Sequence, residues 1–146
     1  MFRGRFEHSI DAKGRVSIPS RFREILVAAS DERLIVTNFD NCLWAYTVPE
    51  WQEIEAKVAA LPQFKPEVKA LQRVFISAAT ECTLDKQGRI LIPPTLRDYA
   101  GITGELVFVG MTKRIEIWSK DRWKQVFSAS VADIEGMADK LGELGL

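Results

Sequence analysis

The sequence predicts an α+β fold, mainly β, built from two tandem copies of one small unit related by pseudo-twofold symmetry. One passage occurs twice, because residues 11–19 (DAKGRVSIP) return as residues 85–93 (DKQGRILIP), and a period near half the length indicates two copies of one structural unit. Short runs alternate apolar and polar residues, as strands buried on one face do. Apolar residues at helical spacing fill only short stretches, which predicts short helices flanking the strands.

Length and composition favour two halves that depend on each other. The chain has 146 residues, of which 47% are hydrophobic, and this is enough for a core. A half of roughly 70 residues is nevertheless at the lower limit for folding alone. We therefore expect one core shared by both halves, or one interface shared by several chains. We assign residues 1–66 to a first module, 67–132 to a second module and 133–146 to an acidic C-terminal tail.

The first half predicts two hairpins and two helices. Alternation over residues 2–10 predicts a strand, and Asp11 and Gly14 favour a tight turn, because Asp accepts backbone hydrogen bonds and Gly tolerates positive φ. The chain then resumes at Arg15 as the second strand of that hairpin. The elements expected next are a helix over residues 19–29, a hairpin over 34–46, and a helix that begins at Thr47, with Thr47 and Glu50 as its capping box.

The second half repeats this plan. A break over residues 61–66 and a helix from Glu67 lead into a strand before Asp85, which begins the second turn. The elements that follow are a strand over 89–92, a helix from Pro94 closed by Gly101, a hairpin over 106–118 and a helix capped by Ser119. After about residue 132 the chain is acidic and contains several glycines, which predicts a weak helix or a loose tail.

Few side chains suit metal binding or catalysis. The chain has one His and two cysteines, Cys42 and Cys82, which are not in a metal-ligand spacing, so we expect buried cysteines and no metal or other cofactor. The two repeated aspartates could suggest the carboxylate pair of an aspartic protease. A hydroxyl and a glycine should then follow each Asp, whereas Ala12-Lys13 and Lys86-Gln87 do, and the lysines would keep the carboxylates ionised. The sequence thus predicts neither an enzyme nor a small-molecule substrate.

Charge is segregated along the chain although the net charge is zero. Residues 1–24 carry a net charge of +3 and residues 133–146 a net charge of −3, so one face can be basic and attract nucleic acid. No apolar run approaches the roughly 20 residues that a membrane helix needs, and no signal peptide precedes the first strand. We expect a cytoplasmic, nucleoid-associated protein without a membrane partner.

The repeated Asp-x-x-x-Arg motif has a structural and a functional interpretation. Turn chemistry alone explains Asp11, Gly14, Asp85 and Gly88. The motif arginines can pair with the aspartates across the turns and point outward to a phosphate or a guanine edge, so we interpret them as DNA contacts. The first copy has more cations nearby in sequence, and we expect the first half to make most of the contacts. The candidate DNA-binding residues are Arg15, Arg3, Arg5, Lys13, Arg89 and Lys86.

Together these residues resemble the MraZ family, which carries tandem AbrB/SpoVT-type domains. The resemblance depends on Met1-Phe2-Arg3-Gly4, on Asp11 with Lys13-Gly14-Arg15 and Pro19, on Asp85 with Gly88-Arg89 and Pro93, and on the repeat distance. It implies two swapped-hairpin AbrB-like β-barrel modules, closed homo-oligomeric rings, and binding to repeated promoter sites on double-stranded DNA. The implied targets are the cell-division and cell-wall gene cluster, including the protein's own operon. The alternative is a structural or protein-binding ring without specific DNA recognition.

Overall fold

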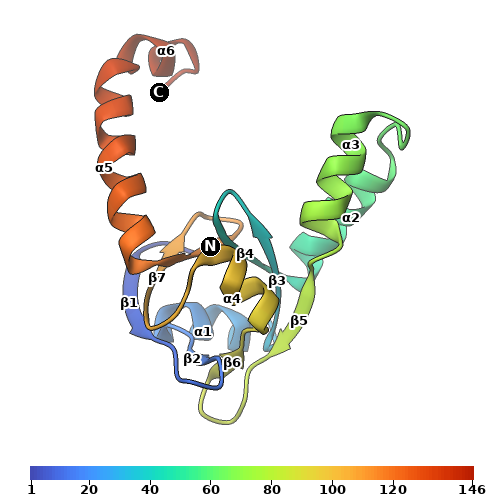
Figure 1. Cartoon of the computed structure of the whole chain (residues 1–146), viewed down its shortest axis with the longest axis vertical. Coiled ribbons are helices and arrows are strands. Elements are labelled where there is room, and N and C mark those ends of the chain that lie inside the picture. The colour runs from blue at the N-terminus through green and yellow to red at the C-terminus, as the bar shows by residue number, and fades with distance from the viewer.

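A β body carries two helical arms that rise from the same side (Figure 1). The computed structural model describes all 146 residues. The first half contains β1 (Arg5–Ser9), β2 (Arg15–Ser17), α1 (Ser20–Ala28), β3 (Arg33–Phe39), β4 (Cys42–Thr47) and α2 (Val48–Ala59). The chain continues through α3 (Pro66–Leu71), the π-helical turn η1 (Gln72–Ile76), β5 (Thr80–Thr83), β6 (Arg89–Leu91), α4 (Pro94–Ala100), β7 (Glu105–Gly110), β8 (Ile115–Ser119), α5 (Lys120–Gly136) and α6 (Ala138–Glu143). The predicted α+β class, with a mainly β body, is confirmed.

The two halves exchange strands. The main sheet has six antiparallel strands in the order β1-β7-β8-β4-β3-β5, and a separate two-stranded ribbon pairs β2 with β6. Each strand of the first half has a counterpart in the second, with β1 matching β5, β3 matching β7 and β4 matching β8. Replacing every strand by its counterpart reverses the order, so the sheet itself has the predicted pseudo-twofold symmetry.

Two predictions about strand pairing are wrong. The six-stranded sheet stays open, so the body contains no closed barrel. The turn at Asp11–Gly14 forms, but β1 pairs with β7 and β2 pairs with β6, so β1 and β2 are not the two arms of one hairpin. Turn residues specify where the chain reverses, whereas the partner of a strand depends on long-range packing.

One core joins both halves, as expected from the small size of each half. Its 21 buried residues come from both copies of the repeat. Phe22 of α1 is fully buried and meets Phe2 and Phe6 edge-to-face, each at 5.3 Å between ring centroids. Cys42 and Cys82 are buried as predicted, and burial raises the pKa of the Cys82 thiol to about 11.

Local helix signals succeed at two helix ends and succeed only in part at a third. The Ser119 hydroxyl accepts a hydrogen bond from the Arg122 backbone N–H at 3.2 Å, so the predicted cap forms. Gly101 ends α4 with a positive φ of 66°. The helix α2 begins after Thr47 as predicted, but the Thr47 side chain makes no capping hydrogen bond. Beyond residue 132 the tail is helical, since α5 continues to Gly136 and α6 follows.

Candidate nucleic-acid interface

The two Asp-x-x-x-Arg turns have the same hydrogen-bond geometry. In the first turn, Asp11 Oδ1 accepts from the backbone N–H groups of Lys13 at 3.0 Å and Arg15 at 2.9 Å, and Asp11 Oδ2 accepts from Arg15 Nε at 2.8 Å. In the second turn, Asp85 Oδ1 accepts from the N–H groups of Gln87 at 2.8 Å and Arg89 at 2.9 Å, and Oδ2 accepts from Arg89 Nε at 2.9 Å. Each carboxylate therefore shapes its turn and orients the arginine four residues later, as the sequence predicts.

These hydrogen bonds favour ionised aspartates. The backbone N–H of Arg15 is the largest influence on the Asp11 carboxyl, and with the Arg15 guanidinium it lowers the Asp11 pKa from 3.8 to about 2. The Arg89 backbone N–H and guanidinium lower the Asp85 pKa in the same way. Hydrogen bonds and opposite charges that favour the charged form have this effect on a carboxyl. Both ion pairs thus persist at neutral pH.

Each turn also carries a glycine that no other residue replaces without strain. Gly14 has a φ of 91° and Gly88 a φ of 74°, in the left-handed region that side chains disfavour. A Cβ on Gly14 would lie 2.8 Å from the Ile92 carbonyl oxygen and 2.9 Å from Arg97 Nε. A Cβ on Gly88 would lie 2.6 Å from Arg23 Nη1. The helix arginine of each half therefore packs on the turn of the other half.

The ribbon brings the two turns onto one surface. Val16 and Ile90 are paired in the centre of the β2–β6 ladder, and both are 1% exposed, so they face the core. Successive side chains of a strand point to opposite faces, which places the flanking residues on the outer face. That face consists of Arg15, Ser17, Arg89 and Leu91. Hydrogen bonds from Ile18 N to Gly88 O at 2.9 Å and from Ile92 N to Gly14 O at 2.8 Å fix both ends.

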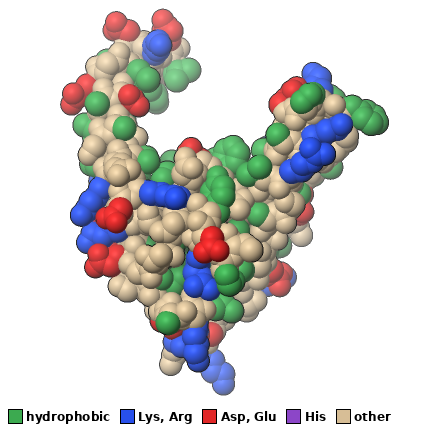
Figure 2. Space-filling view, viewed as in Figure 1, with side chains coloured by type: hydrophobic (Ala, Val, Ile, Leu, Met, Phe, Trp, Pro, Cys, Tyr) green, Lys and Arg blue, Asp and Glu red, His purple; other side chains and the backbone are tan.

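Both motif arginines keep hydrogen-bond donors without a partner on this face. The aspartates use only the Nε atoms of Arg15 and Arg89, and no group of the chain accepts from their Nη atoms. A guanidinium held by one edge keeps its other donors available for a phosphate or for guanine O6 and N7. The exposed Lys13 and Lys86 lie at the tips of the two turns, and Figure 2 shows Lys and Arg side chains at the lower end of the body, below the ribbon.

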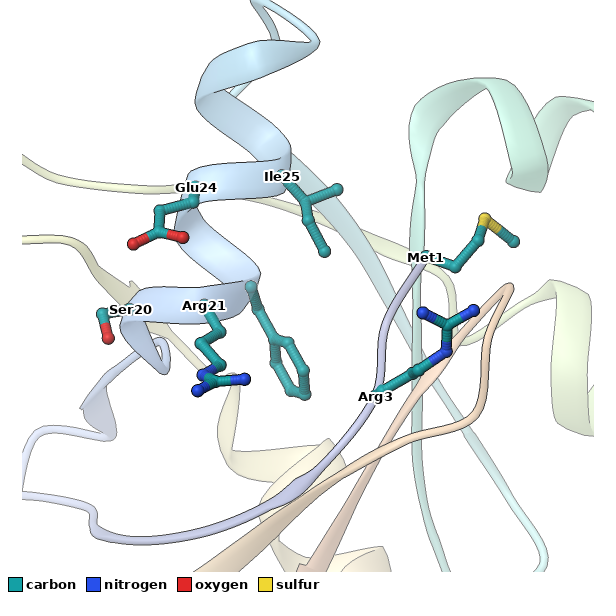
Figure 3. Close-up of a pocket in the computed structure, with 7 residues that line it drawn as sticks. Met1, Arg3, Ser20, Arg21, Glu24 and Ile25 are labelled. Atoms are coloured by element: carbon teal, nitrogen blue, oxygen red, sulfur yellow. The ribbon is translucent and has the colours of Figure 1, made fainter.

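The structure does not bring Arg3 and Arg5 to the turns. Arg5 begins β1, six residues before Asp11, which is roughly 20 Å along an extended strand, and its guanidinium lies 4.9 Å from the ring centroid of Phe127 on α5. Arg3 and Arg21 line a groove of about 510 Å³ between the N-terminal segment and α1. Figure 3 shows their guanidinium groups on opposite sides of that groove. These two candidates thus belong to other surfaces than the ribbon.

Sequence analysis did not single out Ser17 and Leu91, which the ribbon places beside the arginines. Leu91 is 57% exposed and lies on the outer face of the ribbon, opposite Arg15 in the ladder. The sequence held a signal for both residues. Leu91 lies two residues after Arg89 and Ser17 lies two residues after Arg15, and strand residues two apart share a face. An exposed apolar side chain between two arginines can contact a thymine methyl group.

No three His, Cys, Asp or Glu side chains lie close enough together to hold a metal ion. The one histidine, His8, packs edge-to-face on Phe108, and partial burial lowers its pKa. None of the helices combines the length and apolarity that crossing a bilayer requires.

Comparisons with known proteins place this geometry in one family. The sequence model of the MraZ protein family, described as antitoxin-like, matches twice, over residues 1–74 and 75–140. A protein of Thermoanaerobacter sp. named transcriptional regulator MraZ is 44% identical over 147 residues and covers all of both chains. Proteins of the same name from Pelotomaculum thermopropionicum and Desulforamulus reducens are 45% and 44% identical, with 99% or more of each chain covered.

Proposed function

The chain belongs to the MraZ family, and on that premise we propose that it regulates transcription by binding double-stranded promoter DNA through the β2–β6 ribbon. The observation that carries the proposal is the outer face of this ribbon, where Arg15 and Arg89 are oriented by aspartates and keep free Nη donors. Relatives that match this chain over its full length are named transcriptional regulators, which supports the same role.

A ribbon of this size fits the major groove. Paired strands lie about 4.8 Å apart, and the groove of B-DNA, about 12 Å wide, admits a two-stranded β-ribbon. The guanidinium Nη atoms would donate to guanine edges or phosphates, Leu91 would contact a thymine methyl group, and Lys13 and Lys86 would contact phosphates on either side. Both halves of the repeat thus contribute to one DNA-reading surface.

One ribbon alone would bind weakly. It offers four cationic side chains, Lys13, Arg15, Lys86 and Arg89. With about four phosphate contacts, the logarithm of the binding constant should fall with the logarithm of the salt concentration with a slope of about −3.6. We propose that several copies assemble into a ring and engage several promoter repeats together, which raises affinity through effective concentration. The resemblance suggests repeats upstream of the cell-division and cell-wall gene cluster as the target, with the protein acting at the nucleoid.

Fluorescence anisotropy tests the proposal with a duplex taken from the DNA upstream of the protein's own gene and a scrambled duplex of equal length. We expect tighter binding to the upstream duplex. The double variant Arg15→Ala/Arg89→Ala should lose about 100-fold or more in affinity and about 1.8 in salt slope, the value for two contacts. The matched control is Lys113→Ala, since Lys113 is exposed in the β7–β8 turn. It should bind as the wild type does.

The alternative, a protein-binding ring without specific DNA recognition, predicts a different result. The wild type would then bind both duplexes equally, and the double variant would match Lys113→Ala. Circular dichroism and unfolding curves establish that each variant is folded. Equal binding of both duplexes by a folded wild type would replace the proposal by this alternative.

A further inference from the structure

Two arginines that have no charged partner within the chain face one groove. Arg3 and Arg21 line the groove of about 510 Å³ between the N-terminal segment and α1. Figure 3 shows their guanidinium groups on opposite sides of this groove. Both side chains are exposed, and neither forms an ion pair within the chain. Two unpaired cations on one hollowed surface favour a negatively charged ligand.

One carboxylate also lines the groove, but it is not paired with either arginine. Glu24 follows Arg21 by three residues on α1, a spacing at which opposite charges can pair, yet the two side chains form no ion pair. Figure 3 shows Glu24 on the side of α1 that is turned away from Arg3. Ser20, at the start of α1, lines the groove with a hydroxyl group. The space between the two guanidinium groups therefore favours an anion.

Both walls of the groove are held by the body. Hydrogen bonds from Phe2 N to Thr112 O at 2.9 Å and from Thr112 N to Phe2 O at 2.8 Å fix the N-terminal segment. Phe2 is 2% exposed and packs on Phe22 of α1, which also lines the groove. The groove is thus formed before any ligand binds, which lowers the entropy that binding costs.

The other copy of the repeat lacks this pair of cations. At the distance that separates the two Asp-x-x-x-Arg motifs, Arg3 corresponds to Ser77 and Arg21 corresponds to Thr95. The helix α4 nevertheless repeats α1, and the second turn repeats the first. The fold therefore does not require the two arginines, and their presence in one copy indicates a role that belongs to the groove.

A second hollow continues from the groove. It has a volume of about 90 Å³, and Met1 and Ile25 line both hollows. Its other lining residues are one apolar and four polar side chains: Phe2, Thr47, Glu50, Thr112 and Lys113. A ligand that reaches from the arginines to this hollow would have a charged end and an apolar part that carries hydrogen-bonding groups.

We propose that the groove binds a small phosphate monoester of the nucleoside monophosphate class. A phosphate monoester has a charge close to −2 at neutral pH, because its second pKa is about 6, so one phosphate can pair with both Arg3 and Arg21. The planar guanidinium group donates two parallel hydrogen bonds to phosphate oxygens. The nucleoside would lie along Ile25 and Met1, with its base toward the second hollow. The volume of the groove is within the roughly 300–1,000 Å³ that is typical of small-molecule sites.

Other anions match the two arginines less well. A carboxylate has one negative charge and would leave one guanidinium group without a charged partner. A phosphate of a DNA strand is a diester and also has one charge. Inorganic phosphate has the charge but no part that reaches the second hollow. The combination of two cations with a partly apolar extension therefore favours the nucleoside monophosphate.

This inference does not depend on DNA binding by the ribbon. None of the residues that line the two hollows belongs to β2 or β6. The groove is nevertheless connected to the ribbon through α1, because Ser20 follows Ser17 by three residues and Arg23 packs on Gly88. A bound ligand would lie within one helical turn of a residue that contacts the second turn.

Isothermal titration calorimetry on the full-length protein tests the inference with AMP, GMP, CMP and UMP, the four matching nucleosides, and inorganic phosphate. We expect at least one nucleoside monophosphate to bind with one molecule per chain. It should bind about 10-fold or more tightly than its nucleoside and than inorganic phosphate. Arg3→Ala and Arg21→Ala should each weaken this binding by about 10- to 100-fold, the effect of losing one hydrogen-bonded charge contact.

Arg73→Ala is the matched control, because Arg73 is also exposed and also forms no ion pair. It should bind the nucleotide as the wild type does. Arg3 and Arg21 are exposed, so their alanine variants should keep the fold, and circular dichroism verifies this.

Three results would overturn the inference directly. They are no binding of any of the four nucleotides, equally tight binding of the nucleoside or of inorganic phosphate, and wild-type affinity in both groove variants. If Arg15→Ala/Arg89→Ala abolished nucleotide binding while the groove variants did not, the ligand would lie on the ribbon instead. Groove variants that lose affinity for a short duplex with one repeat, but not for the nucleotide, would identify a contact for DNA phosphates and would also overturn it.

Discussion

The turn after β1 and the turn after β5 share only Asp, Gly and Arg, yet they have the same three hydrogen bonds to the aspartate. Their tips differ, because Ala12-Lys13 in the first corresponds to Lys86-Gln87 in the second. The three shared residues are therefore enough to shape the turn. The two tip positions are free to place a lysine on either side, which gives the ribbon one lysine at each end.

The surroundings of the turns differ more than the turns do. Ser9, just before the first turn, pairs with Glu105, whereas Thr83, just before the second turn, pairs with Arg33. Both neighbours have partners, since Glu105 binds Lys120 and Arg33 binds Asp31. The neighbours in sequence that made the first half look more basic, Arg3 and Arg5, lie elsewhere. Each turn then keeps one lysine and one Asp–Arg pair, so the two turns are nearly equal in charge.

The largest effect is expected when one motif arginine is removed at a time, and it tests whether the two turns contribute equally. Arg15→Ala and Arg89→Ala should each weaken binding to a one-repeat duplex by roughly 10- to 100-fold, as expected for loss of one good base or phosphate contact. The two losses should agree within a few-fold. Anisotropy titrations at one salt concentration measure both. A loss confined to Arg15→Ala would mean that the first half alone reads DNA.

The glycines should respond unequally. Alanine at either position costs about 1–2 kcal/mol because of its left-handed backbone. At Gly14 the atom nearest the new Cβ is the Ile92 backbone carbonyl oxygen, which cannot move easily, whereas at Gly88 the three nearest atoms all belong to the flexible Arg23 side chain. Gly14→Ala should therefore lower the free energy of unfolding more than Gly88→Ala. Urea unfolding compares them, and equal losses would contradict this reading of the contacts.

A smaller effect is expected when each carboxylate becomes an amide. Asp11→Asn and Asp85→Asn keep an oxygen that can accept the backbone N–H bonds but lose the ion pair with the arginine. The turns should persist, while the less firmly held guanidinium should bind DNA a few-fold more weakly. Arg15→Ala in the Asp11→Asn background serves as the control, because the two changes should not add. Full additivity would show that the aspartate acts independently of the arginine.

The smallest effect concerns acid titration. The folded pKa of Asp11 is about 2, below its ordinary 3.8, and the backbone N–H and guanidinium of Arg89 lower the pKa of Asp85 as well. A lowered folded pKa means that the stabilisation is complete above about pH 4 and is lost as the pH falls toward the folded value. Carboxyl carbon NMR should show Asp11 titrating near pH 2 and Asp85 titrating below the ordinary 3.8. Two midpoints at 3.8 would mean that the carboxylates make no such bonds in solution.

Much of the fold could be predicted because its signals are local. Alternation identified the strands, Gly101 and Ser119 identified helix ends, and the repeat predicted the symmetry of the sheet. The pairing of β1 with β7 could not be predicted, since no residue near the turn at Asp11 encodes a partner about a hundred residues away. The open sheet could not be predicted either, because closure depends on whether the two edge strands, β1 and β5, meet in space.

The candidate site was predictable in part for the same reason. The Asp11–Arg15 pair lies within one turn, so its geometry follows from five consecutive residues. The joining of both turns in one ribbon, the packing of Arg23 on Gly88, and the positions of Ser17 and Leu91 beside the arginines all depend on contacts between the halves. Arg5 faces Phe127 rather than the turn for the same reason.

The exchanged strands also affect how the chain can fold. β1 and β7 join residues about a hundred positions apart. Closing a loop of that length costs conformational entropy before the strand contacts form, which slows folding. A fragment that ends near residue 66 would keep β3 without its neighbour β5, and the remaining fragment would keep β7 without β1. Neither piece should be stable by itself. Mixed together, the two fragments should regain a cooperative unfolding transition, because each supplies the strand that the other lacks.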